Sequence, residues 1–119
     1  MDSQLPQTVP VINTEVALRR LGGDTKLFAT LASFFLQDAP ALMQQLHDSH
    51  HTGTVEMVFQ SAHSLKGLAG TFEALPFVEL AAEVETMARA RNLMAIESVM
   101  SRLDFEFSRL VAHLQNSAT

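Results

Sequence analysis

The chain has 119 residues, of which 47% are hydrophobic and 18% are charged, so it is long enough for one domain with a core and too short for two. Its net charge is −5 and its eight lysines and arginines form no basic stripe, which argues against nucleic-acid binding. The absence of cysteine excludes disulfides, thiol catalysis and cysteine-ligated metals.

The opening sequence, MDSQLPQTVP, has neither the basic nor the apolar block of a signal peptide. No apolar run in the chain approaches the roughly 20 residues that span a bilayer. We therefore expect a cytoplasmic domain without membrane contact. Pro6 and Pro10 indicate a flexible lead-in or linker remnant over residues 1–11, followed by one domain over 12–116 and a tail over 117–119.

The first predicted helix is short and covers about 12–20, with Ile12, Val16 and Leu18 as its apolar residues. The sequence LGGD ends this helix. Asp24 is expected to cap the next helix by accepting a hydrogen bond from a backbone N–H.

The second predicted helix runs to about His47. Pro40 should kink it, because proline removes a backbone hydrogen bond and its ring clashes with the preceding turn. Apolar residues recur every three or four positions and are expected in the core: Phe28, Leu31, Phe34, Phe35, Leu42 and Leu46. The sequence HDSHHTGT forms the next break, with Thr54 as the expected N-cap of the third helix.

The third predicted helix covers about 55–72. Its apolar seam has the regular spacing of a packed helix and consists of Val55, Val58, Ala62, Leu65, Ala69 and Phe72. The sequence EALP ends this helix, and Pro76 suits the first turn of a fourth helix that runs to about Arg91.

The fourth helix is expected to place Leu80, Val84 and Met87 in the core. Asn92 can cap a fifth helix that extends to about Gln115. The expected core positions of the fifth helix are Ile96, Met100, Leu103, Phe107, Leu110 and Leu114. No stretch predicts a strand. The sequence therefore predicts an all-α fold: an antiparallel up-down four-helix bundle with a short additional N-terminal helix, most simply a monomer.

The nine residues AHSLKGLAG, at 62–70, carry an unusual combination within the third helix. On a helical wheel His63 lies about 130° from the centre of the seam, so it faces outward. Gly67 and Gly70 share that outer face, although glycine inside a helix costs roughly 0.5–1 kcal/mol relative to alanine. The missing Cβ atoms bare the imidazole, which we expect to project into solvent without a permanent internal partner.

Lys66 lies one turn from His63, and its flexible ammonium can reach a phosphate carried on the ring. A neutral imidazole is a competent nucleophile near neutral pH. His63 and Lys66 at this spacing are therefore suited to accepting a phosphoryl group from an activated donor.

The sequence AHSLKGLAG resembles the phosphorylation motif of histidine-containing phosphotransfer (HPt) domains. The resemblance extends to LRRLGGDTKLFATLASFF upstream and LPFVELAAEVE downstream, and covers most of residues 12–115. It implies that His63 accepts phosphate on Nε2 from a receiver-domain aspartate and passes it to another receiver aspartate. It also implies that Lys66 neutralises the phosphate, while Gly67 and Gly70 give the partner room.

Other residues near the site enter through the same resemblance. Gln60 could hydrogen-bond the ring or the phosphate. On the fourth helix Glu85 and Arg89 fall at matching places, and Arg89 is preferred as a phosphate contact because of its charge. The family commonly has a glycine at the end of the third helix, where this chain has Glu73, so the end of that helix is left open.

The implied partners are response-regulator receiver domains and a hybrid histidine kinase. The domain would need no cofactor of its own, because the receiver supplies Mg²⁺. The chain has no glycine-rich nucleotide loop, so we expect neither ATP binding nor autophosphorylation. The proline-bearing start favours the C-terminal module of a hybrid sensor kinase over a free-standing carrier.

Two alternatives remain open on the sequence. The chain could be a helical adaptor that binds receiver or kinase partners without phosphoryl transfer. It could also bind metal through His47, His50 and His51, but these have no third ligand at a rigid spacing, and no metal site is expected. Phe59, next to His63 on the wheel, could belong to the edge of the core or to an apolar docking patch.

Overall fold

The computed structural model describes residues 10–117, so the lead-in expected over 1–9 and the last two positions of the tail lie outside the described residues. Its helices are α1 (Thr14–Arg20), α2 (Thr25–Thr52), α3 (Val55–Gly70), α4 (Leu75–Arg89) and α5 (Leu93–Gln115). The expected all-α class is confirmed. None of the helices in the described range is both long and apolar enough to cross a membrane.

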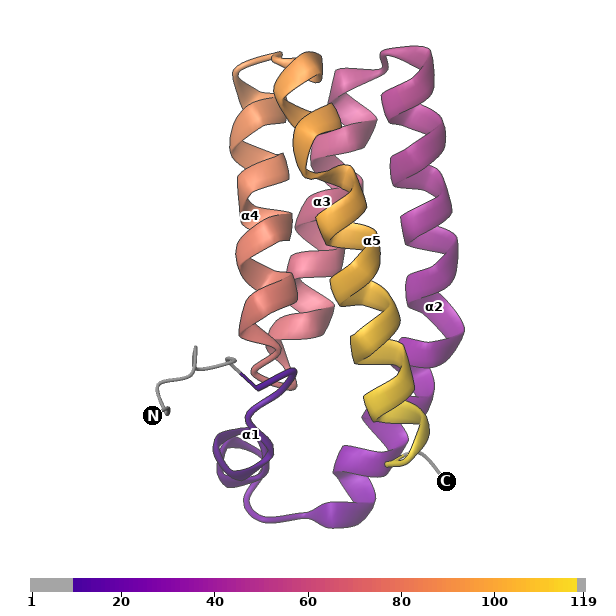
Figure 1. The fold of residues 1–119 in the computed structure, drawn as a ribbon. Coiled ribbons are helices and arrows are strands. Elements are labelled where there is room, and N and C mark those ends of the chain that lie inside the picture. The colour runs from indigo at the N-terminus through magenta and orange to yellow at the C-terminus, as the bar shows by residue number, and fades with distance from the viewer. Residues whose placement is uncertain (1–9, 118–119) are drawn as a thin grey trace, which may run out of the picture.

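The four long helices lie side by side, and successive helices run in opposite directions (Figure 1). The main packing partners of α3 are α2 and α4, and those of α5 are also α4 and α2. The apolar stripes of these helices meet in one buried cluster. This arrangement leaves each long helix one face for solvent, including the face of α3 that carries His63.

The short helix α1 lies beneath the turn that joins α3 to α4 (Figure 1). The backbone N–H of Asn13 donates to the carbonyl oxygen of Glu73 at 3.1 Å, and Arg20 forms an ion pair with the Glu73 carboxylate. Val11 and Ile12 precede the helix and already pack on the core. Packing therefore begins at the last residue of the expected lead-in.

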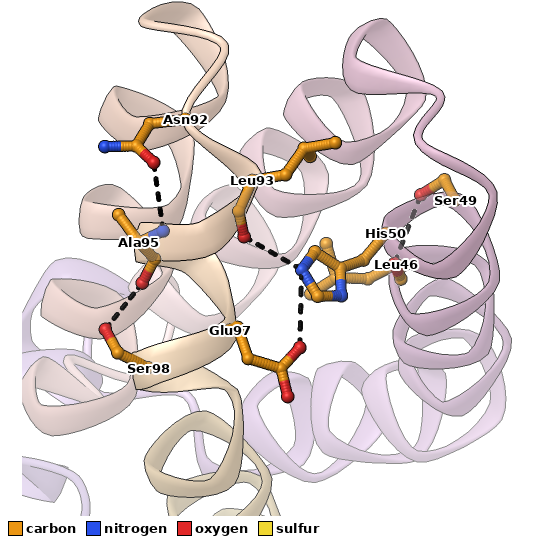
Figure 2. A network of polar contacts seen from close by, with 8 residues as sticks. All are labelled: Leu46, Ser49, His50, Asn92, Leu93, Ala95, Glu97 and Ser98. Atoms are coloured by element: carbon orange, nitrogen blue, oxygen red, sulfur yellow. Dashed lines mark hydrogen bonds and ion pairs between the residues drawn. The ribbon is translucent and has the colours of Figure 1, made fainter.

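The prediction that α2 ends near His47 was wrong, because the helix continues to Thr52. Ser49 is buried, and the His50 ring points from α2 toward α5 (Figure 2). Nε2 of His50 lies 3.1 Å from the carbonyl oxygen of Leu93 and 3.8 Å from a carboxylate oxygen of Glu97. These contacts stabilise one more turn of α2. The helix ends where Gly53 adopts the left-handed conformation at φ 80°.

The predicted core of α2 was also wrong in part. Phe34 is 54% exposed, whereas Phe28, Phe35 and Leu46 are buried as expected. Pro40 is accommodated within the helix, and Figure 1 shows the N-terminal part of α2 curving toward α1. Phe34 and Phe35 are adjacent and lie about 100° apart on the helix, so only one of the two can face the core, and Phe35 does.

The apolar seam of α3 is buried along its whole predicted length, but the helix ends at Gly70 rather than at 72. Thr54 lies at the N-cap position without capping through its side chain; its hydroxyl instead pairs with that of Thr52 at 2.9 Å. Beyond α3, Glu73 has φ 53°, the left-handed region in which glycine is favoured. The glycine that the resemblance led us to expect would thus suit this backbone.

The end of α4 lies two residues before the predicted one, at Arg89, because Arg91 adopts a positive φ of 58°. Asp24 and Asn92 cap α2 and α5 as predicted, accepting from the N–H groups of Leu27 and Ala95. In the predicted cores of α4 and α5 only Met87 and Phe107 are half-buried, and the other members are buried.

Candidate functional site

His63 projects from the middle of α3, on the side away from the core. Its neighbours Ala62 and Leu65 are fully buried, whereas 64% of the His63 side chain is exposed. The helical period produces this division, because Ala62, one position before His63, and Leu65, two positions after it, fall on the buried seam. The ring is therefore open to a partner protein.

Glu85 of α4 lies against the base of this ring. One carboxylate oxygen, Oε2, is 2.5 Å from Nδ1 of His63, and the other, Oε1, is 2.6 Å from Nζ of Lys66. Only 9% of the Glu85 side chain is exposed. A single carboxylate, held between two packed helices, thus contacts both functional side chains that the sequence singled out on α3.

The expectation that His63 has no internal partner was wrong. The partner binds Nδ1, however, and among residues 10–117 Nε2 has no hydrogen-bond partner. A carboxylate accepts a hydrogen bond, so it favours the tautomer with the proton on Nδ1 and a lone pair on Nε2. Glu85 therefore leaves the nitrogen that was predicted to react free and directed away from α4.

The ionisation of Glu85 reflects two opposing influences. Burial raises the pKa of this carboxyl, but hydrogen bonds from Lys66 and His63 and their charges lower it by more. The net result is a pKa below the ordinary value of 4.5. Glu85 is consequently ionised at neutral pH and balances the charge of Lys66.

An aromatic and cationic stack flanks the imidazole on α3 and α4. The rings of Phe59 and His63 lie nearly parallel, 11° apart in plane with centroids 5.9 Å apart. The guanidinium carbon of Arg89 lies 5.1 Å from the centroid of the Phe59 ring. Phe59 also packs on the core, so it belongs to both the core edge and the site.

Gly67 and Gly70 leave open space on the exposed face. A Cβ atom added at either position would meet no atom within 4 Å, apart from the helix's own neighbouring backbone. Close packing between helices therefore does not require these glycines. Their effect is that no side chain projects from these two positions of α3 next to His63.

The remaining candidates take different places from those expected. Lys66 contacts Glu85, and Arg89 lies on Phe59. Gln60 is exposed, and within the described part of the chain the His63 ring donates its hydrogen bond to Glu85 instead. Phe59, Gln60 and Arg89 line a pocket of about 340 Å³ between α3 and α4.

Sequence reasoning preferred Arg89 to Glu85 because charge alone favours arginine as a phosphate contact. A signal for Glu85 was available. Its neighbours at four residues before and three after, Ala81 and Ala88, are apolar, which places this carboxylate on the buried side of α4. A buried carboxylate needs a cation or a hydrogen-bond donor beside it, and His63 and Lys66 fill these roles.

The histidines considered as metal ligands are not gathered together, and two of them, His47 and His50, contact α5. His47 lies 2.7 Å from a carboxylate oxygen of Asp104, and His50 contacts the carbonyl oxygen of Leu93. His51 is exposed. Over residues 10–117 no group of three or more histidine, cysteine or acidic side chains could hold a metal ion.

Comparisons with known proteins bear on the family and the fold of the chain. The family model described as "Hpt domain" matches residues 30–117. The structure of histidine-containing phosphotransfer protein B (HptB) from Pseudomonas aeruginosa PAO1 superposes with a TM-score of 0.82, at 19% identity, over 92% of this chain and 95% of that chain. That similarity concerns the fold. No curated protein matches the chain.

Proposed function

This chain belongs to the Hpt domain family, and on that premise we propose that it is a phosphocarrier in a multistep phosphorelay. His63 accepts a phosphoryl group from an aspartate of one receiver domain and passes it to an aspartate of another. The observation that carries the proposal is the exposed His63 ring, whose Nδ1 is bound by a buried carboxylate while Nε2 stays open.

The transfer is a displacement at phosphorus. The Nε2 lone pair attacks the phosphorus of the aspartyl phosphate, the bond between phosphorus and the aspartate oxygen breaks, and its electron pair returns to the aspartate carboxylate. The proton on Nδ1 stays on the ring, which becomes positively charged. The reverse sequence of bonds delivers the phosphoryl group to the second aspartate.

Glu85 supports this step electrostatically. Its carboxylate faces Nδ1 at 2.5 Å, where positive charge develops as Nε2 bonds to phosphorus. Lys66 provides a cation one turn away for the phosphoryl oxygens, although in the unphosphorylated protein it contacts Glu85. Mg²⁺, when present, belongs to the receiver and neutralises the phosphoryl oxygens there.

The proposed partners are receiver domains, met in the cytoplasm by a monomeric domain. Gly67 and Gly70 let the receiver's active-site surface approach His63, since no side chain rises there. We further propose that the domain is the C-terminal module of a hybrid sensor histidine kinase.

The test uses receiver domains from the genome that encodes this chain, each purified and phosphorylated with ³²P-labelled acetyl phosphate. Mixed with the wild-type protein, at least one should transfer label that is stable to base and labile to acid, as phosphohistidine is. His63→Gln should take no label. If no receiver donates label, or if His63→Gln is labelled to the same yield, the proposal is wrong and an adaptor role becomes the better explanation.

A further inference from the structure

We infer that Phe59 is a positioning residue for the transfer, an inference that rests on the proposed function. Its ring fixes the plane of the His63 imidazole and holds the Arg89 guanidinium beside it. The direct evidence is the stack of His63, Phe59 and Arg89 across α3 and α4.

The need for a second contact follows from geometry. The hydrogen bond to Glu85 holds one ring atom, Nδ1, but a single contact of this kind still tolerates tilting of the imidazole plane. The parallel ring of Phe59 restricts this tilting, because offset-stacked aromatic rings attract at centroid distances of about 4.5–7 Å. Together the two contacts direct the Nε2 lone pair, and in-line attack at phosphorus depends on that direction.

Arg89 gives the stack a second role. Within the part of the chain that the structure describes, Arg89 pairs with no carboxylate, and its guanidinium contact is the Phe59 ring. A guanidinium over an aromatic face is attracted by the electron density of the ring. The other cation at the site, Lys66, is bound to Glu85, so Phe59 holds a guanidinium without a carboxylate partner on the same ring that stacks on His63.

A purely structural role for Phe59 would make a different prediction. Phe59 is only half-buried, and leucine would fill much of the same space against the core. Leucine has no flat face, however, and cannot restrict the imidazole plane or bind the guanidinium. The substitution Phe59→Leu therefore separates the two roles, and Phe59→Tyr restores the flat ring.

The experiment compares two phosphoryl donors for each variant. One is a ³²P-labelled receiver domain, which must align with the ring; the other is phosphoramidate, a small molecule that can reach Nε2 from many directions. Phe59→Leu should slow transfer from the receiver by about fivefold to tenfold. The rate with phosphoramidate should stay within twofold of wild type, and Phe59→Tyr should restore the receiver rate.

Phe105→Leu is the matched control. Phe105 is 62% exposed on α5 and has the Arg109 guanidinium over its ring at 5.8 Å. The substitution therefore removes an arginine–aromatic pair that lies on α5 and not on α3. It should leave both rates unchanged. Nitrogen-15 NMR of the His63 ring adds a direct measure: Phe59→Leu should broaden the ring signals but keep the tautomer protonated on Nδ1, because Glu85 is still present.

Three results would overturn the inference: an unchanged receiver rate in Phe59→Leu, an equal fall with both donors, or a Phe59→Tyr variant as slow as Phe59→Leu. These differ from a failure of the proposed function. In that case the wild-type protein itself takes no label from any receiver.

Discussion

At the residue scale, the site depends on the environment of one carboxylate. Glu85 is nearly buried, yet its contacts with His63 and Lys66 keep its pKa below the ordinary value. An isolated carboxyl group in the same place would be driven toward its neutral form, which carries an O–H donor and is a weaker hydrogen-bond acceptor than the carboxylate. The two partners on α3 therefore preserve the acceptor that sets the tautomer of His63.

This arrangement predicts a pH-dependent contribution to stability. Because the folded-state pKa of Glu85 lies below the unfolded value of about 4.5, the ionised carboxylate stabilises the fold above that pH. The stabilisation is lost as pH falls through the folded-state pKa. Urea unfolding of wild type and Glu85→Gln should show a stability difference at pH 7 that shrinks steadily below pH 4.5.

Glu83→Gln, which neutralises an exposed carboxylate on the same helix, is the control. Its difference from wild type should be small and change little over the same range. A Glu85→Gln difference that persisted undiminished at low pH would contradict the assigned role of the charge.

At the scale of the element, α3 combines a regular buried seam with an outer face that is weakened for helix formation. The seam is continuous from Val55 to Ala69 and holds the helix against α2 and α4. That packing compensates for the helix propensity lost at Gly67 and Gly70. The helix can therefore tolerate glycine where a partner needs space.

Gly67→Ala should separate stability from function. The added methyl group meets no atom within 4 Å and should raise the free energy of unfolding by about 0.5–1 kcal/mol. Transfer from a phosphorylated receiver should slow by about tenfold or more, because the methyl group displaces the approaching surface. Chemical denaturation and ³²P transfer measure the two effects; unchanged transfer in a stabilised variant would refute the access role.

At the scale of the whole molecule, α1 is joined to the bundle through the turn between α3 and α4. Glu73 supplies both connections, a backbone carbonyl to Asn13 and a carboxylate to Arg20, while adopting a positive φ. A non-glycine residue in this conformation costs of order 1–2 kcal/mol. The partly exposed ion pair between Arg20 and Glu73 offsets this cost by about 0–1 kcal/mol.

Two substitutions distinguish these contributions. Glu73→Ala loses the ion pair and keeps the strained backbone, so it should be less stable than wild type. Glu73→Gly loses the ion pair but relieves the strain, and should exceed Glu73→Ala by about 1 kcal/mol in urea unfolding. Equal stabilities of the two variants would show that the turn carries no conformational strain.

Much of the molecule was predictable because its causes are local. The spacing of apolar residues identified the long helices, and the side chains of Asp24 and Asn92 capped their helices as predicted. The position of His63 opposite the seam followed from the 3.6-residue period alone. Each of these features depends only on the sequence of the helix in which it occurs.

The failures have other causes. The end of α2 was misplaced because His50 finds a hydrogen-bond partner on α5 and Ser49 is buried. Phe34 was assigned to the core with Phe35, although adjacent residues lie about 100° apart on a helix and only Phe35 faces inward. The contacts of neighbouring helices decided the first outcome, and the choice between two adjacent apolar residues decided the second.

The sequence by itself determined that this is a helical domain with an outward-facing histidine beside two bare turns, because helical periodicity and glycine's missing side chain are properties of short segments. Only the tertiary structure decided which atoms surround that histidine. The packing angle and register of α4 against α3 bring Glu85 to Nδ1 and Arg89 to Phe59. No local pattern encodes that register; it results from how the side chains of both helices fit together.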